Sequence, residues 1–286
     1  MTKQTRQLGV VITGQNTTDG ATVKLKRIVS QQQKNAFDPF ILLDEFGSDE
    51  PVDYAGGFPD HPHRGFETVT YMLEGAMLHR DHLGNEGHLR AGDVQWMTAG
   101  HGIIHSEMPE QENGLLHGFQ LWINLPAKEK MQPPHYQEFA AAKIPEINLA
   151  DGGYIKIIAG EYVTDTQKIV GPVIGVTTQP LYFDIGLSPQ QQLDIAVFAQ
   201  HTVLVYVYQG ELAIDESNQM LKAGQLGQLI NGDNIQLTTR DQSARFLVLA
   251  ALPLKEPVVQ SGPFVMNSIA EIEQAFRDYR DGVLTL

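Results

Sequence analysis

One pattern occurs twice in this sequence and limits the folds that the chain can adopt. TVTYMLEG ends at Gly75 and leads through a turn at Gly84 to RAGDVQWM, and VLVYVYQG ends at Gly210 and leads through residues 215–218 to KAGQLGQL. Each copy has the order strand, glycine, hairpin, Ala-Gly, strand. The duplication predicts two similar small β-barrels in tandem, each closing its own sheet edges as a double-sheet jelly roll does.

The rest of the sequence also has the residue pattern of a β-sheet protein. Short runs rich in Val, Ile, Tyr, Phe and Thr are separated by Gly, Asn and Asp, which indicates an all-β chain. Strands are expected at residues 23–29, 40–43, 68–73, 93–97, 102–108, 119–125, 154–159, 181–185, 193–199, 203–208, 225–230 and 245–251. Residues 133–153 mix Pro, a short Ala-rich turn and Gly, as a linker does. We therefore expect an N-terminal barrel over residues 1–138 and a C-terminal barrel over residues 139–286.

A single helix signal lies near the end of the chain. Ser268 and Glu271 have the spacing of a capping box. Apolar side chains then recur along one helical face, at Ile269, Ile272, Phe276 and Tyr279. The sequence predicts a structural helix that packs against a sheet and ends the C-terminal barrel.

Composition excludes several classes of protein. The chain has 286 residues, and its 42 % hydrophobic content is enough for ordinary cores, but no apolar run approaches the length of a membrane span. The apolar run at the N-terminus is too short for a signal peptide, so we expect a cytoplasmic protein without membrane contact. With 0 cysteines, disulfides and thiolate metal ligands are excluded. The net charge of −14 argues against direct nucleic-acid binding, and Lys24, Lys26 and Arg27 are expected to form a solvated strand face.

The histidines point to a metal site in the first copy. Alternate residues on a strand share a face, so His61 and His63 in DHPH can converge on one ion, and His105 and Glu107 in GIIHSEMP have the same spacing. The competing interpretation is that Pro62 marks only a turn. Three imidazoles and one carboxylate suit Fe(II), Ni(II), Mn(II), Cu(II) or Zn(II).

The second copy supports the metal interpretation by contrast. Aligning the two copies on their glycines places His61 and His63 opposite Ala196 and Phe198. The second copy has therefore lost the histidines, and a purely structural role would not need to differ between the repeats.

Four segments resemble the signatures of a known family. DPFILLDEF, GGFPDHPHRGFETVTYMLEG, GDVQWMTAGHGIIHSEMP and LHGFQLWINLP are similar to motifs of the pirins, bicupin proteins of the cupin superfamily, densely from about residue 38 to 139. The resemblance implies two face-to-face cupin barrels with one metal in the N-terminal barrel, held by His61, His63, His105 and Glu107. In many other cupins the metal-binding glutamate follows the H-x-H pair. Glu67 has that place here, but we interpret it as a structural or supporting residue.

The other candidates receive weaker interpretations. His101 is read as a turn residue, with a contact at a cavity mouth as the alternative. His79, His82 and His88 flank the Gly84 hairpin and are expected to be solvated. His117, His135 and His201 carry no spacing signal. Most of the aromatic and Met side chains of these strands are expected in the core, with Phe119 or Met97 near a cavity, and the set considered is Trp96, Met97, Phe119 and Trp122.

The resemblance also implies an activity. Several pirins are quercetin 2,3-dioxygenases, which open a flavonol with dioxygen and release carbon monoxide. The implied cofactor is one divalent metal, Fe(II) by preference, the implied base is Glu107, and the implied protein is a monomer. The alternative is a metal-dependent regulatory protein with a protein partner, as some pirins are transcription coregulators or modulators of a metabolic enzyme. A cupin-type sugar isomerase is disfavoured because Arg64, read as an ion-pairing residue, is the one basic side chain near the candidate ligands.

Overall fold

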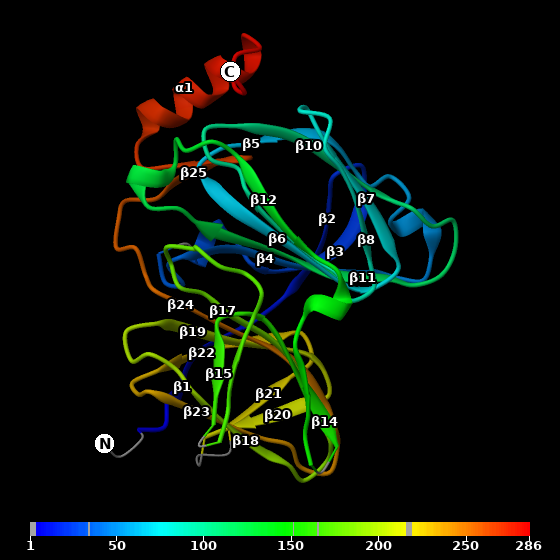
Figure 1. Cartoon of the computed structure of the whole chain (residues 1–286), viewed down its shortest axis with the longest axis vertical. Coiled ribbons are helices and arrows are strands. Elements are labelled where there is room, and N and C mark those ends of the chain that lie inside the picture. The colour runs from blue at the N-terminus through cyan, green and yellow to red at the C-terminus, as the bar shows by residue number, and fades with distance from the viewer. Residues whose placement is uncertain (1–3, 34, 151, 165, 216–218) are drawn as a thin grey trace. The chain divides into compact units, whose positions relative to one another are not determined.

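The computed structural model describes residues 4–33, 35–150, 152–164, 166–215 and 219–286. These residues form antiparallel β-sheets, short 3-10 turns and one α-helix, α1 (Ile269–Arg280), near the C-terminus (Figure 1). The expected all-β fold with a C-terminal helix is confirmed. The turn predicted at residues 215–218 lies, apart from Asp215, outside the described residues. None of the helices described is both long and apolar enough to cross a membrane.

The chain divides into two compact units, and the division differs from the expected one. Residues 15–141 and 254–286 form one unit, here called the first barrel, and residues 1–14 and 142–253 form the other, the second barrel. The N-terminal strand β1 (Gln7–Thr13) pairs with β22 (Gln225–Ile230) of the second barrel. The C-terminal hairpin, β25 (Val259–Ser261) and β26 (Phe264–Met266), joins the first barrel at Arg64. Because such long-range pairings have no local signal, the expected boundary at residues 138 and 139 places both termini in the wrong unit.

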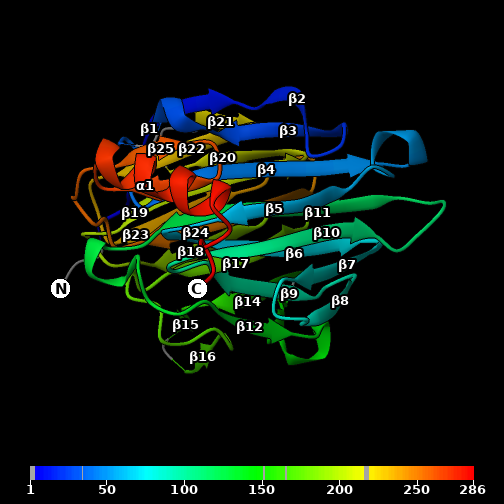
Figure 2. The same cartoon turned by 90° about the horizontal axis from the view of Figure 1, so that it is seen from above.

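The first barrel consists of a seven-stranded and a four-stranded sheet (Figure 2). The larger sheet has the order β12 (His135–Phe139), β9 (Val94–Thr98), β6 (Phe66–Glu74), β11 (Leu116–Asn124), β4 (Phe40–Ser48), β3 (Val23–Val29) and β2 (Gln15–Asp19). The smaller sheet has the order β5 (Phe58–His63), β10 (Ile103–Pro109), β7 (Ala76–Asp81) and β8 (Glu86–Arg90). Leu25, Phe46 and Met72 from the larger sheet pack with Met77 and Leu89 from the smaller one. Two sheets with a shared apolar core make this unit a jelly roll.

The second barrel repeats this topology. Its larger sheet has the order β1, β22, β19 (Thr202–Gln209), β24 (Ala244–Ala251), β17 (Leu181–Leu187), β14 (Gly153–Ala159) and β13 (Glu146–Asn148). Its smaller sheet has the order β18 (Gln192–Ala196), β23 (Asn234–Thr238), β20 (Glu211–Ile214) and β21 (Gln219–Lys222). A hairpin of β15 (Glu161–Val163) and β16 (Lys168–Val170) is added. The predicted tandem duplication is thus present in the strand order of both barrels.

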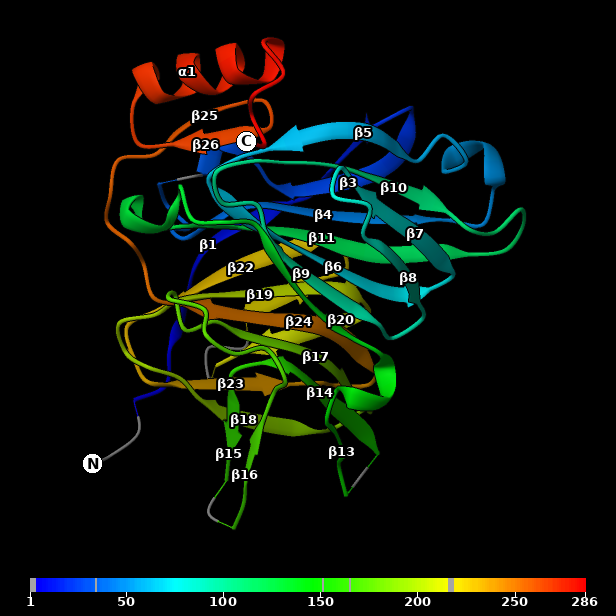
Figure 3. The same ribbon diagram turned by 45° about the horizontal axis from the view of Figure 1, so that its top comes forward.

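Helix α1 begins with the predicted capping box. The Ser268 hydroxyl accepts a hydrogen bond from the backbone N–H of Glu271 at 3.3 Å, and the Glu271 carboxylate accepts one from the Ser268 hydroxyl at 2.8 Å. Figure 3 shows α1 beside β25 and β26, and Ile272 packs with Phe264 and Met266 of β26. Ile269 is 68 % exposed, so the buried face of α1 is narrower than the apolar face that the sequence predicted. The helix covers a small hairpin of the first barrel instead of ending the second barrel.

Candidate metal centre

Strand β5 carries the H-x-H pair at the edge of the smaller sheet. An edge strand has one side without ladder partners, so it tolerates Pro62, which has no N–H to donate. β5 pairs with β10 such that Ile103 lies opposite His63 and His105 lies opposite His61. The proline therefore stands inside a strand, and the pairing brings the H-x-H and H-x-E segments together.

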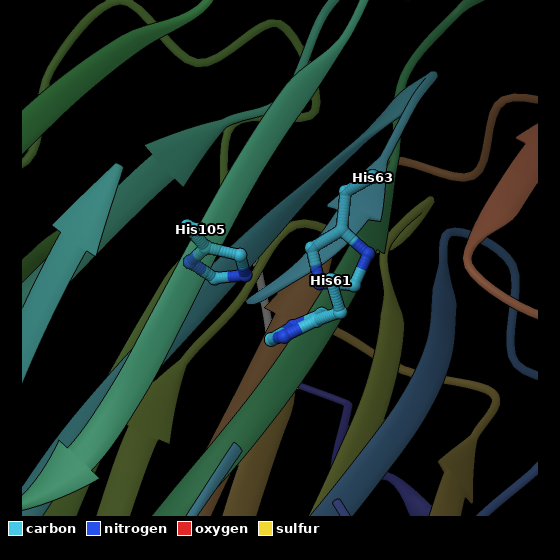
Figure 4. A group of neighbouring side chains, drawn as sticks. All are labelled: His61, His63 and His105. Carbon is cyan, nitrogen blue, oxygen red and sulfur yellow. The ribbon is translucent and has the colours of Figure 1, made fainter. Parts of the chain in front are cut away.

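The three histidines converge (Figure 4). His61, His63 and His105 each place one ring nitrogen within 4.8 Å of the others. Their ring centroids are 4.6 Å apart for His61 and His63, 4.3 Å for His61 and His105, and 4.9 Å for His63 and His105. The convergence that the spacing predicted is present.

The donor atoms of this cluster fit a divalent metal ion. His61 Nδ1 lies 2.9 Å from the Pro59 carbonyl oxygen, to which it can donate, leaving Nε2 for an ion. His63 Nδ1 and His105 Nε2 are buried and have no hydrogen-bond partner among the described residues. Burial lowers the pKa of both His63 and His105 well below the usual value, and the neighbouring imidazoles lower it further. Neutral imidazoles with free lone pairs, in a chain without thiolates, suit Fe(II), Ni(II), Mn(II), Cu(II) or Zn(II).

Glu107 lies beside this cluster but is not a member of it. It is 5 % exposed and lines the same cavity as His61 and His63. Its Oε1 accepts a hydrogen bond from the Thr70 hydroxyl at 2.9 Å, and the same hydroxyl lies 2.7 Å from Oε1 of Gln120, a second acceptor. Thr70 has one proton, so it can donate to one of these two acceptors at a time. The Thr70 hydroxyl thus holds Glu107 at the cavity wall.

Glu67 is a buried carboxyl group of the larger sheet and is not part of the histidine cluster. Gly65, at φ +89°, turns the chain from the smaller sheet into the larger one, so Glu67 does not continue the strand face of His63. Glu67 is 4 % exposed and accepts a hydrogen bond from the Thr98 hydroxyl at 2.9 Å. Burial raises the pKa of Glu67 to about 7, although the Thr98 hydrogen bond acts in the opposite direction.

The segment after His63 is fixed by a buried cation. Arg64 pairs with Asp278 of α1 at 2.7 Å and donates to the carbonyl oxygens of His101 and Leu284. Arg64 is therefore an ion-pairing residue, as expected, but a buried one. His101 lies in the turn before β10 and is not among the residues that line the cavity.

His79 does not have the solvated position that the sequence suggested. Its side chain is 1 % exposed, and its Nε2 lies 2.7 Å from Nδ1 of His105. His82 and His88 are exposed, as predicted. Position 79 points inward because β7 alternates, and the buried Met77 shares its face. That alternation was a signal available in the sequence.

A cavity of about 680 Å³ opens beside the cluster. Its wall includes His61, His63, Glu107 and Trp122, and the Trp122 ring lies 5.2 Å from the His63 ring. Trp96, Met97 and Phe119 are core residues, and the expected Phe119 or Met97 does not line this cavity, whereas Trp122 does. Arg27 also lines the cavity, and its guanidinium makes two hydrogen bonds to Asp44 at 3.0 and 2.7 Å. It is thus not part of a freely solvated face.

The second barrel shows which residues replace this constellation. Gly75 before β7 and Gly210 before β20 have equivalent positions in the two barrels. Four residues after these glycines come His79 and Ile214, respectively. The ladders pair His79 with Glu107 and Ile214 with Leu237. Leu237 therefore has the place of Glu107.

The same ladders relate the three histidines to their counterparts. His105 precedes Glu107 by two residues and pairs with His61, and Ile235 precedes Leu237 by two residues and pairs with Ile195. On each edge strand the next residue with an inward side chain lies two positions further along, which is His63 in β5 and Val197 after β18. The resulting pairs are His61 and Ile195, His63 and Val197, and His105 and Ile235.

These pairs correct the sequence alignment by one residue. We expected Ala196 and Phe198 opposite the H-x-H pair, but Phe198 is 60 % exposed and faces outward. A shift of one residue exchanges the two faces of a strand. The true counterparts are buried aliphatic residues of the second core, so the three imidazoles are not repeated at these positions.

Two jelly-roll barrels, one with a histidine cluster beside a cavity, define a bicupin with a candidate metal centre in its first barrel. Residues 22–123 match the family model described as Pirin, and residues 182–285 match the one described as Pirin C-terminal cupin domain. The chain belongs to the pirin family, as the motifs indicated.

Relatives and solved structures agree with this assignment. A Pseudomonas aeruginosa protein provisionally named quercetin 2,3-dioxygenase is 48 % identical over 96 % of each chain. Human pirin is 40 % identical over 92 % of this chain and 88 % of its own length. A crystal structure described as quercetin 2,3-dioxygenase from Acinetobacter baumannii aligns with a TM-score of 0.91 at 33 % identity, over 98 % of this chain and 99 % of that one.

Proposed function

We propose that this protein is a metal-dependent dioxygenase that opens a flavonol, as quercetin 2,3-dioxygenases do. The observation that carries the proposal is the common cavity of His61, His63 and Glu107. Its volume of about 680 Å³ lies within the range of roughly 300–1,000 Å³ typical of small-molecule sites. The names of the Pseudomonas and Acinetobacter proteins support this substrate class. A regulatory protein needs no such cavity.

His61, His63 and His105 would hold the ion, and Glu107 is proposed as the fourth ligand, with Fe(II) as the preferred metal. When bound, the divalent ion supplies Lewis-acid polarisation, which lowers the pKa of the flavonol's 3-hydroxyl group. Glu107 takes the proton of that hydroxyl group. The hydrogen bond from Thr70 keeps the receiving carboxylate at the cavity wall.

The cavity wall would orient the substrate. Trp122, Phe46 and Phe58 offer flat apolar surfaces for an aromatic ring system and exclude water from it. Dioxygen is the oxidant, and one ring carbon leaves as carbon monoxide. The bidentate contact with Asp44 fixes the Arg27 side chain in the same wall.

The test is reconstitution of the apo-protein without oxygen. Fe(II), Ni(II), Mn(II), Cu(II) or Zn(II) is added, and loss of quercetin absorbance and release of carbon monoxide are measured in air. We expect turnover above the protein-free blank with at least one metal. Glu107→Gln and His105→Ala should abolish both signals while the protein stays folded, whereas Glu110→Gln, at an exposed site on the same segment, should not change them.

Two outcomes would contradict the proposal. Full turnover in Glu107→Gln would remove the carboxylate from the mechanism. Stoichiometric metal binding without turnover of quercetin or any other flavonol would reject the dioxygenase and favour the metal-dependent regulatory protein.

A further inference from the structure

His79 is the buried neighbour of one proposed metal ligand. It lies on β7, with its Nε2 2.7 Å from Nδ1 of His105 and its ring centroid 4.9 Å from that of His105. The side chain is 1 % exposed and does not line the cavity. It therefore cannot contact a substrate there, but its ring nitrogen lies at hydrogen-bond distance from His105.

The contact decides which nitrogen of His105 carries the proton. Two neutral imidazole nitrogens at hydrogen-bond distance share one proton, so one ring donates and the other accepts. If His79 donated, the proton of His105 would reside on Nε2, which is the buried nitrogen without a partner. That nitrogen would then have no lone pair for an ion. If His79 accepts, Nδ1 of His105 is protonated and Nε2 is free to bind a metal.

We propose that His79 is a positioning residue, which accepts the Nδ1–H of His105 and so presents His105 Nε2 to the metal. The inference rests on the metal site of the proposed function but not on its substrate. Partners of this kind fix the tautomer and ring orientation of a ligating histidine and raise its basicity.

His79 is itself held in place from the larger sheet. The Tyr136 ring of β12 packs edge-on against the His79 ring at 5.3 Å. The Tyr136 hydroxyl donates to the Asp81 carboxylate at 2.9 Å, and Asp81 also accepts from the backbone of Leu83 and Asn85. These contacts restrict rotation of the His79 ring, so its accepting nitrogen stays aimed at His105.

The second barrel gives an independent argument. Ile214 has the place of His79 there, next to Leu237, which has the place of Glu107. The imidazole at this position is thus present in the barrel with the ligand cluster and absent from the one without it. A histidine kept for packing alone would not need to follow the ligands.

Three variants test the role. His79→Leu removes the acceptor at similar volume, and His79→Gln keeps an acceptor near the position of Nε2. His88→Leu is the matched control, since His88 is exposed on the adjacent strand β8, opposite Leu78. The dissociation constant of Zn(II) is measured by competition with a chelator, and the apo-proteins are compared by thermal melting.

We expect His79→Leu to weaken Zn(II) binding by roughly 10- to 100-fold, the cost typical of losing such a partner. His79→Gln should stay within about threefold of wild type, since it still accepts the hydrogen bond. Nitrogen-15 shifts of His105 in the apo-protein should show Nδ1–H in wild type and His79→Gln, and a mixture of tautomers in His79→Leu. A merely structural role would lower thermal stability without moving the tautomer.

Other outcomes overturn the inference. Wild-type affinity in His79→Leu, an unchanged His105 tautomer in that variant, or a wild-type protein that binds no Zn(II) would each reject it. Zn(II) binding that depends on His79, in a protein that consumes no flavonol with any metal, would reject the proposed function and keep this role. Flavonol turnover by the wild-type protein, together with an unchanged Zn(II) affinity in His79→Leu, would keep the proposed function and reject this role of His79.

Discussion

The two barrels share a strand order but differ in what fills the space between their sheets. In the second barrel the inward positions of β18, β20 and β23 are aliphatic and join one continuous apolar core. In the first barrel the matching positions on β5, β7 and β10 are His61, His63, His79, His105 and Glu107. The same fold thus tolerates either an apolar core or a polar centre. What distinguishes the barrels is a handful of side chains on strands that the ladders already fix.

The largest expected effect on metal binding comes from replacing a histidine of the first barrel with the aliphatic residue that has its place in the second barrel. His63→Val should weaken metal binding by at least about 100-fold, more than the loss of a supporting partner costs. The apo-protein should keep its stability or gain about 1 kcal/mol, because a buried nitrogen without a partner is removed. His61→Ala should also lose the metal with a modest loss of stability. Metal analysis and thermal melting of the apo-proteins check both, and an unchanged metal content would remove the mutated residue from the ligand set.

The reverse substitution should be costly. Ile235→His places an imidazole at the second-barrel position of His105, inside an apolar core without polar partners. We expect the second barrel to lose about 2–4 kcal/mol, from desolvation and lost packing. Hydrogen exchange of β22 and β24 amides measures this loss. The chain has 2 tryptophans, Trp96 and Trp122, and both lie in the first barrel, so tryptophan fluorescence does not report on the second barrel directly. If the second barrel of Ile235→His were as stable as that of wild type, its core would not require an apolar residue at this position.

Acid and base titration should also separate the barrels. Glu67 of the first barrel has its pKa raised by burial from 4.5 to about 7. Between these values the folded protein binds more protons than the unfolded chain, so the contribution of Glu67 to stability falls as pH rises from about 4.5 to about 7. Compared with Glu67→Gln, wild type should lose about 1–3 kcal/mol over this range. Urea unfolding of the apo-proteins, followed by tryptophan fluorescence, measures it, and parallel pH curves would contradict the raised pKa.

His201 of the second barrel should give the opposite slope. Burial, and to a smaller extent the charge of Arg6, lower its pKa from 6.5 to about 4. Here the unfolded chain binds more protons between the two values, so stability rises with pH from about 4 to about 6.5 and is then constant. The difference between wild type and His201→Gln, from hydrogen exchange of β19 amides, should rise by about 1–3 kcal/mol over that range. A flat difference would mean that His201 titrates normally.

The smallest effect is expected at the helix that only the first barrel carries. Ser268→Ala removes the side chain that caps α1, at a cost of about 1 kcal/mol. Because the cap is far from the histidines in the chain and touches none of them, Zn(II) affinity should not change. Thermal melting and chelator competition check the two halves of this prediction. A large loss of metal affinity would instead make the helix part of the metal site.

Local patterns account for what could be predicted. The glycine-centred repeat indicated two barrels, Ser268 and Glu271 indicated the helix start, and the H-x-H and H-x-E spacings indicated the converging residues. Each signal spans only a few residues, because strand alternation and helix capping are properties of neighbouring residues. The tendency of His61, His63 and His105 to meet followed from this alternation together with the family motifs.

Other features depended on pairings between distant segments. Only the ladder register placed His79 behind His105, Trp122 in the cavity wall, and Ile195 and Val197 opposite the histidine pair. Pairings between distant segments also decided that the N-terminal strand belongs to the second barrel and the C-terminal segment to the first. Register and long-range pairing are decided by how whole sheets close around their cores, and a shift of one residue reverses every side chain of a strand. The sequence by itself therefore determined the repeat, the donor types and their spacing, whereas the tertiary structure alone decided which side chains stand behind and around them.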